Sequence, residues 1–428
     1  MTTTDTRRGY DAAVWVALVA AGFALTAVAR GAGLRVGVPG APFTGEYRVK
    51  VEFGTLLAPA VAVLVLGSVR AGVVERLGWR RLLLLAYLAT LAWSLALAVV
   101  DGGNGLAYPV SHEYLPDVDM VAGDPARFVR HFVANAHAFD ESTRTHPPAP
   151  VLLLWALGKV GATRPATLGV VITALGCLTV PAVAVSMRSV CGERAARRLL
   201  PALVLAPYAV WVAVSMDGVT AALVALFVML GVVGSEPGRR PWWAIGSGLA
   251  LGVAALFSYA VGWLAAILLI VCFVRRRAAL IALVGFGALV PLAVARAWGF
   301  VWPDGLTAAQ ADWSVRVGPH RSWLVWAFLD IVVLVVACGP HVVTAARRIR
   351  RTPGWPFVVG ALVGVAFAIG SGLSRGEVER SWLPFFPWLL VPVTGDDDDG
   401  EPGRPSLLLL ALGAGAAVVI ESVLRSAW

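Results

Sequence analysis

Acidic and histidine side chains gather in one long polar segment, residues 101–146, which lies between two apolar runs. A carboxylate in such a segment can act as a general base toward a hydroxyl group. The motif HEYLPDVD brings three acids and a tyrosine together, and another acid opens the segment. An ordinary solvated loop, with acids for solubility, is the alternative interpretation. The candidate catalytic acids are Asp101, Glu113 and Asp117, and the candidate substrate contacts beside them are Tyr114 and Asp119.

Two further short stretches carry ionisable side chains at the ends of apolar runs. One is SMDGVTAAL, whose lone carboxylate is a functional candidate at this depth and equally a helix N-cap. The other is the turn SRGEVERSW (374–382), whose two arginines can bind a phosphate in fork geometry. Local pairing of these arginines with the neighbouring glutamates is the competing interpretation. The candidate substrate contacts are Asp217, Arg375, Glu377, Glu379 and Arg380.

The polar segment ends in RTHPPAPVLLLWALGKVGA (144–162), where Arg144 and His146 are two more candidate substrate contacts. Its apolar part, 151–160, is about ten residues, or roughly 15 Å as a helix. A helix that crosses a membrane needs about twice that length. The prolines cannot continue an incoming helix, but they suit the first turn of a new one.

We call the short apolar stretch 151–160 the stub. The direction of the chain after it is indicated by three arginine clusters, at 188–198, 275–277 and 347–351. If the stub crossed the membrane, all three clusters would face outward. Basic residues prefer the cytoplasmic side, so we expect the stub to stay on the outer surface. The segment 101–167 then lies outside, and the apolar spacing within 125–139 predicts an amphipathic helix on the membrane surface.

Composition indicates a polytopic membrane protein. Hydrophobic residues make up 58% of the 428 residues and charged residues only 14%, whereas a soluble domain carries about 25% charged residues. We expect an all-α transmembrane bundle of about thirteen spans, with the N-terminus inside and the C-terminus outside. The predicted spans are 12–29, 53–69, 82–100, 168–187, 199–216, 218–234, 242–258, 260–274, 279–295, 323–343, 355–373, 381–394 and 405–424.

Other classes of site are not favoured by the sequence. The net charge of +9 comes largely from arginines in short loops, where they orient helices, so nucleic-acid binding is not expected. The four cysteines show no CxxC spacing and the histidines no HExxH spacing, so we predict neither a metal site nor a cofactor, although a divalent cation stays open. The acidic run 396–399 is interpreted as a solvated break between spans.

Taken together, these motifs resemble the GT-C superfamily of membrane glycosyltransferases that use polyprenyl-phosphate sugars. Its best-known relatives are the lipid A aminoarabinose transferases and the protein O-mannosyltransferases. The resemblance covers most of 82–395, and THPPAPVLLLWALGKVGA is its most specific part. Residues 1–81 then look like two added spans, and 396–428 like an acidic cytoplasmic loop followed by a last span. The family begins with one span before its large outer loop, whereas this chain has three.

The resemblance implies transfer of a hexosyl or pentosyl group from a polyprenyl-phosphate donor to an envelope glycan, lipid or protein acceptor, outside the cell membrane. An outer-loop acid would deprotonate the acceptor hydroxyl, with the choice between Asp101 and Glu113 open. Asp217 matches the second outer carboxylate of the family, and Arg144, His146, Arg375 and Arg380 would steady the lipid phosphate. A transporter or flippase of envelope precursors is the alternative; its ionisable residues would lie near mid-membrane within an inverted repeat. A non-catalytic membrane scaffold is the third possibility, and it would need no such set of acids and arginines on one face.

Overall fold

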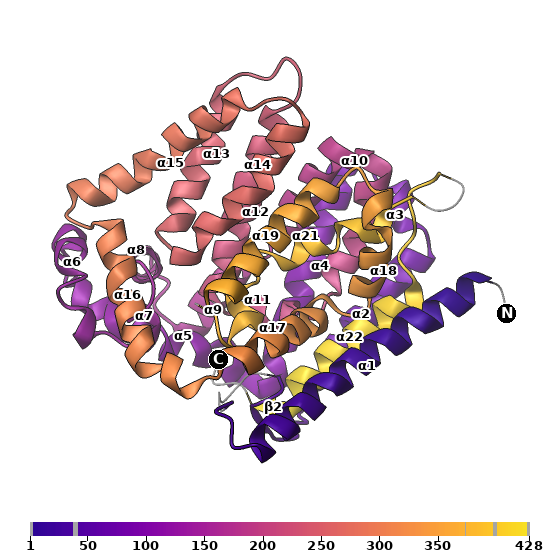
Figure 1. Cartoon of the computed structure of the whole chain (residues 1–428), viewed down its shortest axis with the longest axis horizontal. Coiled ribbons are helices and arrows are strands. Elements are labelled where there is room, and N and C mark those ends of the chain that lie inside the picture. Colours follow the sequence, from indigo (N-terminus) through magenta and orange to yellow (C-terminus); the bar gives the residue numbers. More distant parts are fainter. Residues whose placement is uncertain (1–2, 37–41, 373, 397–399, 426–428) are drawn as a thin grey trace.

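The computed structural model describes residues 3–36, 42–372, 374–396 and 400–425 of the chain (Figure 1). This part is an all-α bundle, as the composition predicted. Its strands are the two-residue β1 (Glu46–Tyr47) and β2 (Leu424–Arg425), which pair antiparallel and join the N-terminal and C-terminal parts of the chain.

Within the described residues, six helical stretches are long and apolar enough to cross a membrane, which makes the chain a multi-pass membrane protein. They are Arg7–Gly31 of α1 (Thr3–Gly31), Phe53–Arg70 formed by η1 (Phe53–Leu56) and α2 (Leu57–Arg70), α4 (Trp79–Ala98), Pro165–Val204 formed by α9 (Pro165–Gly176) and α10 (Thr179–Val204), α12 (Met216–Gly234), and α15 (Ala279–Ala297).

A bent pair and several shorter apolar helices complete the bundle. The pair consists of α16 (Trp302–Arg316) with η6 (Gly318–His320), and α17 (Trp323–Cys338); its two parts meet at 95°. The shorter helices are α8 (Ala149–Lys159), α13 (Trp242–Ala255), η5 (Tyr259–Leu264) with α14 (Ala265–Val274), α19 (Trp355–Ser371) and α22 (Leu407–Val423).

The remaining elements are short. They are α3 (Val73–Arg76), η2 (Val99–Leu106), α5 (Tyr108–His112), η3 (Leu115–Val121), α6 (Pro125–His131), η4 (Ala136–Ala138), α7 (Glu141–Arg144), α11 (Ala209–Val212), α18 (His341–Arg348), η7 (Ile349–Arg351), α20 (Val378–Ser381), α21 (Phe386–Leu389) and η8 (Val391–Thr394).

Two arginine-rich turns lie side by side, 70–81 and 188–198; in the second, the non-helical Gly192 breaks α10. The Arg197 guanidinium donates hydrogen bonds of 2.9 and 2.7 Å to the carbonyls of Val74 and Leu77. The chain between these turns therefore crosses the bundle an even number of times. The candidate spans in this part of the chain are α4 and Pro165–Val204, and α8 is too short to count as one. That the stub does not cross stays a prediction.

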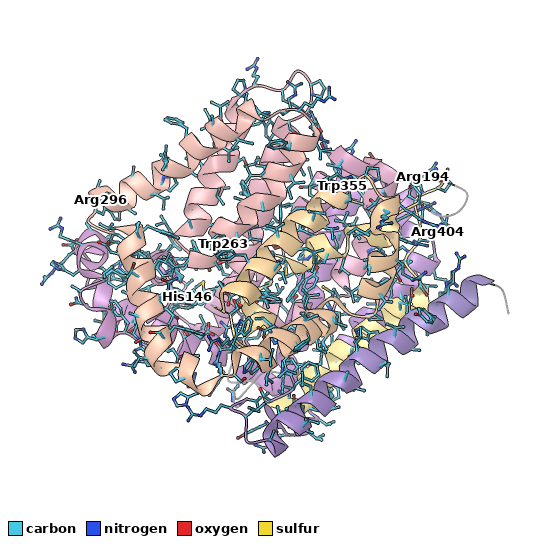
Figure 2. The ribbon with its side chains drawn as sticks, in the orientation of Figure 1. His146, Arg194, Trp263, Arg296, Trp355 and Arg404 are labelled. Atoms are coloured by element: carbon cyan, nitrogen blue, oxygen red, sulfur yellow. The ribbon has the colours of Figure 1, made fainter. Side chains whose placement is uncertain are left out.

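The other arginine-rich turns join the same end of the bundle, which we call the basic end. Arg275 donates to the Ser189 carbonyl at 2.6 Å, and the Asp396 amide donates to the Arg351 carbonyl at 2.8 Å. Figure 2 shows Arg194 and Arg404 at this edge, with His146 far from them on the opposite side. The opposite end holds the segment 101–146, and we call it the loop end.

At the loop end, α8 packs with the polar segment into a hydrophobic cluster of its own. Val151 and Leu154 of α8 are buried there together with Val110 and Tyr114. The eleven residues of α8 span about 16 Å, which is half a membrane. The stub is therefore part of the structure that holds the polar segment in place.

The amphipathic helix expected over 125–139 is shorter than predicted. Only Pro125–His131 forms α6, with Asp124 accepting from the Arg127 amide as its N-cap. The apolar side chains meant for the membrane surface face the protein instead, because Phe128, Phe132 and Phe139 are buried and contact one another. The spacing correctly predicted that these side chains are buried, but they pack against the protein and not against the membrane.

The span predicted at 381–394 is not one helix. It consists of short helical turns, with Pro384 between α20 and α21 and with Pro387 and Pro392 in the first turns of α21 and η8, and nearly all of its side chains are buried. Proline removes a backbone donor and breaks a continuous helix. Irregular backbone at membrane depth is tolerated where protein covers it, and α19 and α10 contact this segment. Of the acidic run, only Asp396 lies within the described residues.

Candidate functional site

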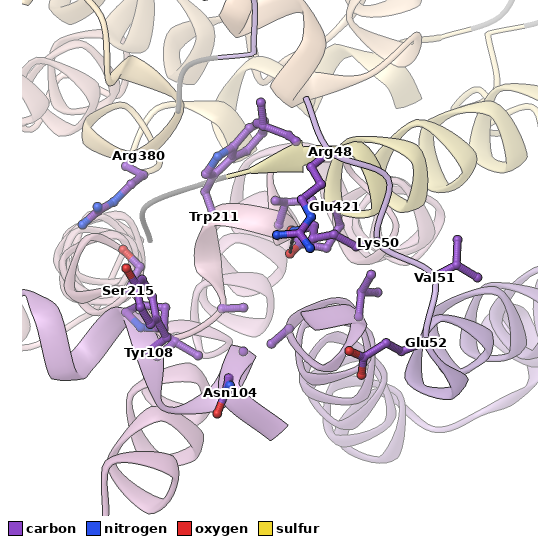
Figure 3. Close-up of a pocket in the computed structure, with 18 of the residues that line it drawn as sticks. Arg48, Lys50, Val51, Glu52, Asn104, Tyr108, Trp211, Ser215, Arg380 and Glu421 are labelled. Carbon is purple, nitrogen blue, oxygen red and sulfur yellow. Dashed lines mark ion pairs between the residues drawn. The ribbon is translucent and has the colours of Figure 1, made fainter. Parts of the chain in front are cut away.

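A cavity of about 520 Å³ opens at the loop end, between parts of the chain that are distant in sequence (Figure 3). Its walls come from residues 48–52, from 98–113, from the turn 210–215, from Arg380 and from the end of α22. Glu113 and Arg380, both predicted site residues, line it. The described residues thus bring two of the sequence-predicted groups to one hollow.

Arg380 is the centre of a buried ion-pair cluster at this cavity. Its Nη1 lies 2.5 Å from Oε1 of Glu113, and its Nη2 lies 3.3 Å from Oδ2 of Asp217. All three side chains are at most 13% exposed. The sequence placed these residues in three separate stretches on one side of the membrane, and the fold joins them around a single guanidinium.

Burial and charge oppose each other at this cluster. Burial raises the pKa of the Glu113 carboxyl, and the neighbouring Arg380 acts against this without cancelling it. Burial lowers the pKa of Arg380, but Glu113 and Asp217 more than offset it, so that pKa lies above its ordinary value. Glu113 is therefore a stronger base than a solvated glutamate and still has a fixed cation beside it.

Asp217 reaches Arg380 because of the backbone just before α12. Ser215 caps that helix, and its side chain accepts the Asp217 amide at 3.1 Å. Asp217 is thus in the first turn and is not the N-cap that the sequence allowed. A carboxylate in the first turn is favoured by the helix dipole. Val214, directly before the cap, takes a positive φ of 57°.

Tyr114 and His146 lie behind Glu113. Tyr114 is buried, and its ring meets that of His146 edge-on at 5.9 Å. The His146 ring nitrogen Nδ1 lies 2.8 Å from the Ser142 carbonyl. Burial raises the pKa of the Tyr114 hydroxyl, and the nearby Asp217 and Glu113 charges raise it further. Neither residue lines the cavity, but both lie close enough to Glu113 for their charges to influence one another.

Three predicted residues of the polar segment lie away from the cavity. Asp117 accepts the Asp140 amide at 3.2 Å and so ties two parts of the segment together. Arg144 pairs with Asp312 of α16 at 3.1 Å. Asp119 is exposed. Asp117 and Arg144 hold the segment in its place, and Asp119 faces outward beside it.

The side chains of the turn 374–382 differ in their surroundings: Arg375 and Glu377 make polar contacts, and the Glu379 carboxylate has no hydrogen bond within the described chain. Arg375 donates to the carbonyls of Gly318 and Arg321 and lies over the Trp313 ring, and Glu377 pairs with Arg321. These contacts of Arg375 and Glu377 thus lie around Arg321, outside the turn, and are not the Arg–Glu pairing within the turn that the sequence analysis gave as the alternative. Glu379 is fully buried next to Arg380, and neither of its carboxylate oxygens has a hydrogen-bond partner in the described chain. Burial raises its pKa to about 8.

Asp101, the other candidate base, lies in η2, but its side chain is outside the described residues. Among the described residues, no group of three or more His, Cys, Asp or Glu side chains gathers as a metal site.

Several cavity residues were missed by the sequence analysis. Arg48 and Lys50 come from the loop before η1, and Trp211 comes from α11. Glu421, near the end of α22, pairs with Lys50 at 3.8 Å. No motif marks any of them, because only the pairing of β1 with β2 brings the loop 46–52 beside the end of α22.

Comparisons with known proteins give a limited result. No protein-family profile and no curated protein match this sequence. Among solved structures, ArnT from Cupriavidus metallidurans bound to undecaprenyl phosphate is similar with a TM-score of 0.45 and 17% identity, over 74% of this chain and 59% of that one. The same protein in its apo state gives a TM-score of 0.41 and 18% identity, over 70% and 58%. This chain thus spans less than two thirds of the length of ArnT, and its function has to be argued from its own residues.

Proposed function

We propose that this chain is a membrane glycosyltransferase that moves a sugar from a polyprenyl-phosphate donor to a hydroxyl group of an envelope glycan, lipid or protein. The observation that carries the proposal is the Glu113 carboxylate, with its raised pKa, at the wall of a cavity where Arg380 holds it in place. A base, a fixed charge and a hollow for substrate meet at one end of an apolar bundle.

In the reaction, Glu113 takes the proton from the acceptor hydroxyl while the acceptor oxygen bonds to the anomeric carbon of the sugar. The bond between that carbon and the phosphate oxygen breaks, and its electron pair stays on the phosphate. Charge thus moves from the acceptor side to the phosphate side. Cations fixed near the departing phosphate lower the barrier without a proton transfer.

Arg380 supports the base rather than the phosphate in this proposal. It faces two carboxylates, so its positive charge is already neutralised. It keeps Glu113 ionised despite burial and fixes the direction of its carboxylate. Asp217 holds the other side of the guanidinium and prevents it from rotating away.

The side of the membrane follows from the arginine distribution. The turns of the basic end carry the arginine clusters, and such clusters favour the cytoplasm. The cavity lies at the opposite end, so the proposed transfer takes place outside the cytoplasm. An envelope acceptor and a lipid-linked donor, rather than a soluble nucleotide sugar, suit that side.

Purified protein in detergent tests this function and separates it from a flippase. Lipid extracts from cells without the gene, where we expect the donor to accumulate, are incubated with the protein and with envelope fractions from the same cells. We expect the lipid-linked sugar to be consumed and one envelope component to gain that sugar. A flippase moves lipids between leaflets and has no leaflets to connect in detergent, so it would leave the donor unchanged. An unchanged donor would therefore overturn the proposal.

A further inference from the structure

The segment 46–53 carries charge and apolar surface in alternation. Arg48, Val49, Lys50 and Val51 all line the cavity, and the apolar side chains of Val49, Val51 and Phe53 are 74%, 75% and 89% exposed. Figure 3 shows Arg48 and Lys50 beside Glu421, with Val51 pointing away from them. A segment of a membrane protein that presents cations and exposed apolar side chains together at the mouth of a hollow is suited to an amphiphile with an anionic head.

The backbone of this segment is fixed at both ends. The amides of Arg48 and Lys50 donate to the carbonyls of Val423 and Ser422, each at 2.7 Å. Glu52 then caps η1 through the reciprocal contacts it makes with Thr55. We call the ordered segment 46–53 the strap. Because its backbone is held, less conformational entropy is lost when its cations bind a ligand than would be lost by a loose loop.

The three basic side chains at the cavity differ in their ion-pair partners. Arg380 is held by Glu113 and Asp217. Lys50 pairs with Glu421 at 3.8 Å. Arg48 is exposed, and its guanidinium has no hydrogen-bond or ion-pair partner in the described chain. An arginine with its fork of donors unoccupied matches a phosphate, which it can bind through two parallel bonds.

A neutral donor also lines the cavity. Trp211 lines the cavity and is 3% exposed, and its indole N–H has no acceptor among the described residues. A buried N–H without an acceptor costs stability unless something completes it. An oxygen of a ligand that fills the cavity would complete it.

We infer that the strap 46–53, with Arg48 as its principal cation, is the docking edge for the phosphate and the first isoprene units of a long-chain isoprenyl monophosphate. This rests on the proposed function, since it names where the donor of that reaction binds. The phosphate lies on Arg48 and Lys50, and the chain runs over Val49, Val51 and Phe53 into lipid. The subsite is complete only when β1 and β2 are paired.

The test is equilibrium binding of a radiolabelled polyprenyl monophosphate to the purified full-length chain in nanodiscs. We expect Arg48→Ala to raise the Kd roughly tenfold or more, the usual effect of losing a charged hydrogen bond, and Arg48→Lys to raise it less. The matched control is Arg277→Ala, which removes an exposed arginine at the basic end and should leave the Kd unchanged. Unlabelled polyprenol should not compete with the probe.

Three results would overturn the inference: an unchanged Kd in Arg48→Ala, an equal loss in Arg277→Ala, or equal competition by phosphatidylglycerol. The last would mean a site for any phosphate headgroup. Failure of this inference and failure of the proposed function look different. If wild type binds the probe through Arg48 but transfers no sugar, only the function fails; if it transfers sugar and Arg48→Ala binds normally, only the docking edge fails.

Discussion

Arg380 Nη1 lies 2.5 Å from Glu113 Oε1, although the two residues belong to distant parts of the sequence. This contact closes the polar segment 101–146 against the turn that follows α19. It also sets the chemical character of the cavity, because it keeps a buried carboxylate charged. Breaking a buried ion pair from one side leaves its partner uncompensated, which is costly.

Replacing Arg380 by Leu should therefore destabilise the protein by about 3–5 kcal/mol, since two buried carboxylates lose their cation. The loss is measured as the temperature at which half of the detergent-solubilised protein leaves the monodisperse peak. The triple variant Arg380→Leu, Glu113→Gln, Asp217→Asn should regain much of that temperature. If the triple variant is no more stable than the single one, the ion pairs do not hold this end together.

The pH profile of transfer should report the Glu113 carboxyl. Only its ionised form accepts a proton, so activity rises with pH through its pKa. Burial raises that pKa, so we expect the acid limb above the usual value of about 4.3. The Asp217 charge adds to the rise, so Asp217→Asn should shift the limb to lower pH. A limb that moves upward in this variant would contradict the assignment.

Glu379 should make stability fall as pH rises. Burial raises its pKa from 4.5 to about 8, so the folded state holds a proton that the unfolded state releases between these values. Stability is full below pH 4.5 and falls by up to about 1.4 kcal/mol per pH unit until pH 8. Glu379→Gln keeps the shape without the charge. It should match wild type at low pH and exceed it at pH 9; equal stability at pH 9 would contradict this.

Cysteine labelling tests the two ends of the bundle. Three of the native cysteines are buried and the fourth is half-buried, so the background is low. In whole cells, a membrane-impermeant maleimide should label Glu141→Cys at the loop end. It should label Arg277→Cys at the basic end only after permeabilisation. The reverse pattern would place the cavity in the cytoplasm and remove the envelope acceptor from the proposal.

Sequence reasoning succeeded where charge and length decide the outcome. Arginine clusters identified the turns of one end, and the length of the stub predicted the short helix α8. Because Glu113, Asp217 and Arg380 were placed on the same side, their meeting was an expected consequence, although their exact partners were not. Side-chain pairing depends on packing that no local pattern records.

Sequence reasoning failed where the same composition or spacing is compatible with more than one structure. The apolar run 381–394 has the content of a span, but prolines divide it and the bundle covers it. The phenylalanines of 125–139 have the spacing of a membrane-facing stripe, yet they pack into protein. Arg48 and Lys50 looked like loop charges, because nothing local predicts that β2 would hold them at the cavity.

The central claim is that Glu113 is the base for transfer from a polyprenyl-phosphate sugar. The most direct test uses the donor that accumulates in cells without the gene. Binding and transfer of this donor are compared for purified wild type and Glu113→Gln.

We predict that Glu113→Gln binds the donor with a Kd close to that of wild type, while transfer falls roughly 10²-fold to 10⁴-fold, the contribution of a general base. Transfer by Glu113→Gln at the wild-type rate, with equal amounts of folded protein, would contradict the account.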